Sequence, residues 1–154
     1  MKTLLALLIL ATPAAAQEIT RTYASPTAAI AQVVRVPPGF ETIYLSGVLP
    51  DLPQGAPAPN TEVQAESAFA KIDRILAANG LTAGDVVSMT IYLVADPANQ
   101  GRMDFAGMMR SYGKHYGTPA QPNRPSRSTV QVSALAGPGF LIEVEVTAAK
   151  KPSP

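Results

Sequence analysis

The 154-residue chain has no cysteine and no tryptophan, and its single histidine is His115. The lack of cysteine excludes a thiol nucleophile, a disulfide and a cysteine zinc site. One histidine cannot form a histidine cluster, and we expect His115 to lie partly exposed in the last turn of a helix rather than to bind a ligand. There is also no glycine-rich phosphate loop. We therefore expect an activity that needs neither a metal nor a cofactor.

Charged residues are scarce, and neither sign dominates. Only 15% of the residues are charged, with 12 Lys and Arg against 11 Asp and Glu. Leaving out Lys2, which lies in an N-terminal leader, makes the two counts equal at 11. Proteins that bind nucleic acids normally carry a basic patch, because neutralising phosphates supplies much of their affinity. We therefore expect no nucleic-acid partner.

The only long apolar run is N-terminal, and residues 1–16 are predicted to be a secretory signal peptide. Lys2 gives the charged start, residues 3–11 are mostly apolar, and Ala14-Ala15-Ala16 matches an A-x-A cleavage site. The run is too short for a stable membrane span, and an uncleaved anchor or a buried N-terminal helix is the alternative. We expect one domain over residues 17–154, exported across the inner membrane to the periplasm and not associated with a membrane after cleavage.

The hydrophobic pattern of this domain predicts an α+β fold. Its element order is β-β-α-β-α-β-β, with two helices on one face of a mixed sheet and the other face either solvated or covered by another subunit. A hairpin turns at residues 37–39, and Thr61 with Gln64 forms a capping box. The expected strands are 28–36, 40–47, 86–94, 127–132 and 141–146, and the expected helices are 61–79 and 104–116.

The last two predicted strands carry the charged residues of most interest. They are joined by a Gly-Pro-Gly turn, so Arg127 and Glu143 are expected on neighbouring strands. Alternation places Ile142 and Val144 toward the core, with Glu143 and Glu145 on the opposite face. An arginine binds a substrate carboxylate well, and a nearby carboxylate can activate water. The alternative is the ordinary solvated face of a sheet, with Glu145 in a structural or peripheral position.

Several segments together resemble the RidA (YjgF-like) reactive-intermediate deaminases, over nearly the whole mature chain. The resemblance rests on their order and spacing, since each segment alone is common. The segments are Tyr44-Leu45-Ser46-Gly47 before Pro50, Gln64, Leu76-Ala77-Ala78-Asn79-Gly80-Leu81 followed by Asp85-Val86-Val87, Asp104-Phe105-Ala106, Arg127-Ser128-Thr129-Val130 and Ile142-Glu143-Val144-Glu145.

The resemblance implies a chorismate-mutase-like fold, a homotrimer, and ligand clefts between adjacent subunits. Arg127 matches the arginine that binds the carboxylate of an imino or enamino acid, and Glu143 matches the glutamate that positions the hydrolytic water. Thr129 takes the place of a cysteine or threonine beside the arginine. Ser46 is a candidate wall residue of the cleft, although a hydroxyl that stabilises the turn is the alternative.

The chain departs from the family pattern at three positions. Residues 31–34 lack the usual tyrosine, Val48 follows Ser46-Gly47 in place of glutamine, and Met109 stands where the second helix usually has asparagine. These changes remove polar groups from the expected pocket. The resemblance still implies hydrolytic deamination of 2-imino or 2-enamino acids to 2-oxo acids and ammonia. The alternative is a trimer that binds a small carboxylate metabolite without turnover.

Overall fold

The computed structural model describes residues 18–152, so the predicted signal peptide lies outside the described residues. The long elements follow the sequence prediction closely, with shifts of a few residues at their ends. In chain order the strands and α-helices, short ones included, are β1 (Thr20–Thr22), β2 (Val33–Arg35), β3 (Glu41–Val48), α1 (Thr61–Ala78), β4 (Val86–Val94), α2 (Phe105–His115), β5 (Ser126–Val132) and β6 (Ile142–Lys150).

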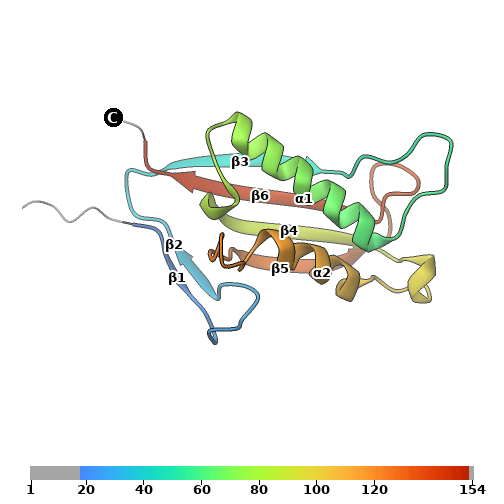
Figure 1. Ribbon diagram of the computed structural model, residues 1–154, viewed down its shortest axis with the longest axis horizontal. Coiled ribbons are helices and arrows are strands. Elements are labelled where there is room, and N and C mark those ends of the chain that lie inside the picture. The colour runs from blue at the N-terminus through green and yellow to red at the C-terminus, as the bar shows by residue number, and fades with distance from the viewer. Residues whose placement is uncertain (1–17, 153–154) are drawn as a thin grey trace, which may run out of the picture.

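Strands β3 to β6 form one mixed sheet with the spatial order β3-β6-β4-β5. Strand β6 pairs antiparallel with both β3 and β4, whereas β5 pairs parallel with β4. Figure 1 shows α1 and α2 side by side across one face of this sheet, and the two helices also contact each other. The predicted α+β class, mixed sheet and one-sided helical layer are confirmed. Among the described helices, none is both long and apolar enough to cross a membrane.

The predicted N-terminal hairpin is wrong. Strand β2 spans only three residues and pairs antiparallel with β1, not with β3. Residues 20–22, which lie outside the strands expected from the sequence, form β1. Arg21 anchors β1 by donating from Nη2 to the carbonyl oxygen of Gly84 at 2.9 Å. Because Pro37 and Pro38 have no backbone N–H, the ladder is not extended toward β3.

The hydrophobic core fills the space between the helices and the sheet. Ile91, Ile142 and Val144 line the sheet side and are fully buried, whereas the helices contribute Phe69 and Tyr112. Alternation along each strand places these residues on one face of the sheet, as predicted for β6. The helix-facing side of the sheet is therefore apolar, and a charged residue on that side needs an explanation.

The predicted capping box is wrong by one residue. Asn60 caps α1 by accepting from the amide of Val63 at 3.1 Å. The Thr61 hydroxyl instead donates to Asp96 Oδ2 at 2.8 Å. Gln64 accepts from the Leu141 amide at 2.8 Å, so it joins the start of α1 to the β5–β6 connection. The side chains of Thr61 and Gln64, which the sequence assigned to a helix cap, thus form hydrogen bonds with distant segments instead.

His115 joins the two helices and is more buried than expected, with only 11% of its side chain exposed. Its Nδ1 lies 2.8 Å from Asp73 Oδ2, and its Nε2 lies 3.5 Å from Glu66 Oε1. Lys114 also contacts Glu66 at 3.0 Å. The hydrogen bond to Asp73 is the main cause that raises the pKa of His115, although burial opposes it. The protonated histidine therefore stabilises the packing of α2 on α1.

We expect the free energy of unfolding to fall as the pH rises above about 6.5, the ordinary pKa of histidine. The folded-state pKa is raised, so the stabilisation by His115 is complete below the unfolded pKa and is lost as the pH rises through the folded one. Urea unfolding at several pH values measures this. In His115→Gln the fall should be absent, and an equal fall in that variant would contradict the assignment.

Candidate functional site

Arg127 lies near the start of β5, an edge strand of the sheet, and faces the helices. It pairs in register with Met89, which is buried in the core. Thr129 pairs with the buried Ile91, so its side chain points the same way. The side chains of Arg127 and Thr129, both predicted to belong to the site, thus lie on the apolar side of the sheet, beside α2.

Aromatic and thioether groups of α2 surround the Arg127 guanidinium. Its Cζ lies 4.3 Å from the ring centroid of Tyr112 and 5.9 Å from that of Phe105. Nη2 lies 3.1 Å from Met109 Sδ. The Tyr112 hydroxyl donates to the carbonyl oxygen of Ala29 at 3.0 Å, and burial raises the pKa of this tyrosine to about 12. The phenol therefore stays neutral at ordinary pH and offers its ring face to the cation.

Three polar atoms of this group have no hydrogen-bond partner within residues 18–152. They are Nε and Nη1 of Arg127 and Oγ1 of Thr129, and all three are buried. Burial lowers the pKa of Arg127, but an arginine stays protonated in proteins. Leaving a buried donor unsatisfied costs about 1–3 kcal/mol, and more for a charged one. The arrangement is therefore suited to an anionic ligand that supplies the missing acceptors.

Glu143 and Glu145 lie on the opposite face of the sheet, which no helix of the described chain covers. Glu143 pairs with Tyr92, and Glu145 accepts a hydrogen bond of 3.0 Å from the Tyr92 hydroxyl. That bond is the first cause that raises the pKa of Tyr92. Glu145 thus already has a partner within the chain, whereas no hydrogen bond of Glu143 is seen among the described residues. Glu143 is therefore the carboxylate that remains available for chemistry.

The predicted adjacency of Arg127 and Glu143 is wrong within one chain. Strand β4 lies between β5 and β6, and the two side chains emerge on opposite faces of the sheet. The Gly-Pro-Gly segment lies in a connection that joins β5 to β6 past the intervening strand β4, and not in a hairpin turn between adjacent strands. The reason is that β5 pairs parallel with β4, which a short sequence motif does not reveal. A site with both residues needs two copies of the chain.

Gly47 lies against Glu143 across the β3–β6 pair, at an irregularity in the register. A Cβ at Gly47 would overlap the Glu143 carboxylate. The glycine therefore allows the carboxylate to lie directly over the strand. Ser46, the predicted wall residue, is exposed beside it. The Ser46-Gly47 pair is thus next to Glu143 and apart from Arg127.

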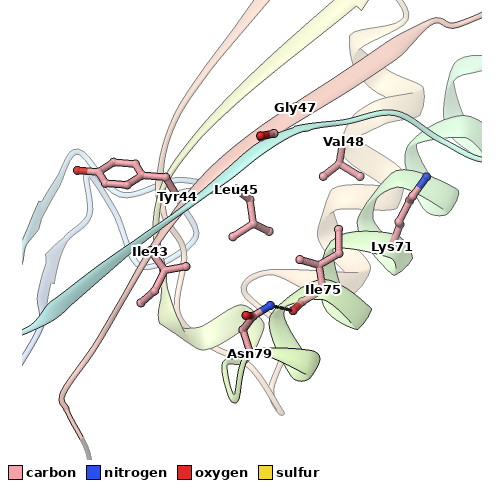
Figure 2. A pocket seen from close by; sticks show the side chains of 9 residues that line it. Ile43, Tyr44, Leu45, Gly47, Val48, Lys71, Ile75 and Asn79 are labelled. Atoms are coloured by element: carbon pink, nitrogen blue, oxygen red, sulfur yellow. Dashed lines mark hydrogen bonds between the residues drawn. The ribbon is translucent and has the colours of Figure 1, made fainter.

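A cavity of about 400 Å³ lies between β3 and α1 (Figure 2). Ile43, Leu45 and Ile75 point into it, whereas Tyr44 points away toward the uncovered face. Two of its polar side chains are already bound: Lys71 contacts Asp51 at 3.0 Å, and the Asn79 amide donates to the Ile75 carbonyl at 2.8 Å. Ser46 also lines the cavity. Neither Arg127 nor Glu143 lines this cavity. It is not the predicted carboxylate site.

Comparison with known proteins identifies the family. The family model described as "Endoribonuclease L-PSP" matches residues 24–150. DfrA of Myxococcus xanthus is 37% identical over 120 residues, which cover 76% of this chain and 82% of DfrA. A RutC family protein of Haemophilus influenzae is 30% identical over 135 residues, covering 87% of this chain and 98% of that protein. The chain belongs to the RidA/YjgF family.

Solved structures agree with this RidA/YjgF membership. A Rid family protein of unknown function from Yersinia pestis superposes with a TM-score of 0.62 at 25% identity, covering 79% of this chain and 87% of that one. TdcF of Escherichia coli, solved with bound serine, gives a TM-score of 0.58 at 29% identity, covering 75% and 84%. The name of TdcF assigns it provisionally to the reactive-intermediate deaminases. The relatives of this chain thus include a protein named as such a deaminase and a Rid family protein of unknown function.

Phe105, Met109 and Tyr112 lie on one face of α2, and helical spacing alone favours assigning such a stripe to the core. The structure buries Tyr112 but leaves Phe105 43% exposed. The three residues surround Arg127, and only the helical spacing hinted that they share a face. Their relation to Arg127 depends on how α2 packs on β5.

We expect Gly47→Ala to displace the Glu143 carboxylate while leaving the fold intact. The overlapping atoms belong to the end of a flexible side chain, so the glutamate moves rather than the strand. Any reaction that needs this carboxylate should slow by up to about 100-fold. Gly113→Ala in α2 is the matched control, because its Cβ meets nothing within 4 Å. Equal activity in both variants would argue against a defined Glu143 position.

Proposed function

We propose that this protein hydrolyses 2-imino or 2-enamino acids to 2-oxo acids and ammonia, in clefts between copies of the chain. The observation that carries the proposal is the half-buried Arg127, whose guanidinium has two buried nitrogens without an acceptor within residues 18–152. A substrate carboxylate would supply those acceptors through charge-assisted hydrogen bonds. The amino acid serine bound to the relative TdcF also carries a carboxylate, which is consistent with this ligand class.

The second part of the proposal is that a neighbouring copy supplies Glu143. Within one chain Arg127 and Glu143 lie on opposite faces of the sheet. The uncovered face also carries the exposed side chains of Tyr44 and Val130, which are suited to burial against another copy. A closed homotrimer would bring the uncovered face of one subunit toward the Arg127 edge of the next.

The chemistry needs little more than positioning. Arg127 holds the substrate carboxylate, and Glu143 orients a water molecule and accepts its proton as the water oxygen bonds to C2 of the iminium. The proton is returned to the nitrogen, and as the C2–N bond breaks the C2 hydroxyl gives its own proton to Glu143 and becomes the carbonyl of the 2-oxo acid. The released ammonia takes up that proton and leaves as ammonium. The Thr129 hydroxyl, which has no partner in the described chain, would bind a substrate oxygen. No covalent enzyme intermediate is needed.

One observation favours binding without turnover as a second candidate function. Met109 Sδ lies where Arg127 meets α2, a position at which the resemblance implied asparagine. A thioether is a poor hydrogen-bond partner for a reacting imine. In that case the clefts would bind a small carboxylate, and Glu143 would have no catalytic role.

We expect Arg127→Ala to lower kcat/KM for an imino acid roughly 10- to 100-fold, since a hydrogen bond to a charged group contributes about 1.5–3 kcal/mol. Glu143→Gln should keep ligand binding but slow turnover by about 100-fold or more. Glu145→Gln is the matched control on the same strand face and should stay active. Ammonia release from an imino acid generated in place by an amino-acid oxidase measures all three.

Coexpression of Arg127→Ala with Glu143→Gln tests the shared cleft. Each variant alone should retain at most about a tenth of wild-type turnover, but in a randomly mixed trimer about a quarter of the clefts would combine an intact Arg127 with an intact Glu143 from another copy. Recovered ammonia release therefore supports a site between subunits. No recovery in confirmed mixed oligomers would mean that the two residues do not share a cleft. Absence of wild-type turnover together with Arg127-dependent ligand binding would favour the binding function.

A further inference from the structure

Arg127 lies against a continuous wall of three side chains on α2. Phe105, Met109 and Tyr112 are spaced four and three residues apart, so they share one face of the helix. The wall runs from Tyr112, which is 1% exposed, to Phe105, which is 43% exposed. Its inner end stacks on the guanidinium and its outer end reaches solvent. A ligand that approaches the guanidinium along α2 therefore passes Phe105 and Met109.

Met109 contacts the third guanidinium nitrogen of Arg127, the one that has a partner in the described chain. Nε and Nη1 are buried, and Nη2 contacts Met109 Sδ at 3.1 Å. A thioether sulfur is a weak acceptor, whereas a carboxylate forms a strong charge-assisted bond with arginine. An entering carboxylate therefore displaces the sulfur from Nη2. The methionine side chain has three rotatable bonds, so it can repack against the ligand without movement of the helix.

The rest of such a ligand would lie beside apolar surface. The carbon next to the carboxylate lies within one bond of it, so its substituent falls next to Met109 and Phe105. Polar side chains of this helix are already bound elsewhere. Asp104 accepts from the Gly107 amide at 2.8 Å, and Arg110 donates to Glu62 at 2.8 Å. A charged or hydroxylated substituent would lose its water without gaining a partner on this wall.

We propose that Met109 and Phe105 select ligands of the Arg127 site that carry apolar side chains. This inference rests on the proposed function for the role of Arg127 in binding a carboxylate, and it adds the class of side chain. The substrates would be 2-imino acids with aliphatic or aromatic substituents, and the corresponding 2-oxo acids would bind as products. Polar and acidic relatives would bind more weakly.

Calorimetry with stable 2-oxo acids tests the selection without requiring turnover. The probes are 4-methyl-2-oxopentanoate and phenylpyruvate as apolar ligands, and 3-hydroxypyruvate and 2-oxoglutarate as polar ones. We expect wild-type protein to bind the apolar probes at least about 10-fold more tightly, the lower end of what one methylene contributes in an apolar pocket. Ammonia release from the matching imino acids is measured in parallel.

Two substitutions of Met109 separate polarity from size. Met109→Gln keeps the length of the side chain but adds an amide, whose oxygen would bind Nη2 of Arg127 more strongly than the sulfur does. All the probes should therefore bind more weakly. The preference for apolar probes should also shrink to about 3-fold or less, because the amide is polar. Met109→Leu keeps an apolar group and should preserve the preference. Phe105→Ser changes an exposed residue of the wall, so the protein should stay folded, and it should also reduce the preference. Arg127→Ala should abolish binding of every probe.

The outcomes distinguish this inference from the proposed function. A preference that survives in both Met109→Gln and Phe105→Ser, with binding still dependent on Arg127, overturns the inference and leaves imine hydrolysis standing. A preference lost in these variants of a protein that turns over no imino acid supports the inference and rejects hydrolysis. Wild-type protein that binds none of the four probes overturns the inference.

Discussion

The positive charge of Arg127 is held on the apolar side of the sheet without a carboxylate partner among the described residues, and the local architecture is arranged around it. The Tyr112 ring lies 4.3 Å from its Cζ, and the Tyr112 hydroxyl fixes the segment at Ala29. Such a cation is costly to bury unless something completes its hydrogen bonds. The same feature would make the site selective for anions, because a carboxylate would supply the hydrogen-bond acceptors that the described residues do not.

The sheet order determines how this cation could meet Glu143, the carboxylate that we propose to be catalytic. Strand β4 separates β5 from β6, and strand alternation places Glu143 on the face away from the helices. Gly47 leaves room for that carboxylate to lie across β3. One protomer therefore presents two half-sites on opposite faces. Packing of the uncovered face against another copy would both bury exposed side chains such as Tyr44 and join the two halves, so assembly and activity would depend on the same surface.

Much of the fold was predictable because its signals are local. The Val86–Val94 strand and the helix capped by Asp104 were predicted from alternation and helical spacing, and the structure confirms both. The errors occurred where a residue or strand could pair with more than one segment of the chain. Thr61 bonds to Asp96 instead of capping its own helix, and β2 pairs with β1 instead of β3. In each case a contact distant in the sequence replaced the local one.

Sequence alone identified the side chains that we propose for the chemistry, because Arg127 and Glu143 are marked by their motifs and by the alternation of their strands. It also determined family membership, since the order and spacing of several weak segments are specific together. Only the tertiary structure decided that these two residues face opposite ways and that Phe105, Met109 and Tyr112 surround the arginine. The reason is physical: alternation fixes the two faces of each strand, but strand order and helix packing are set by burial of the whole core.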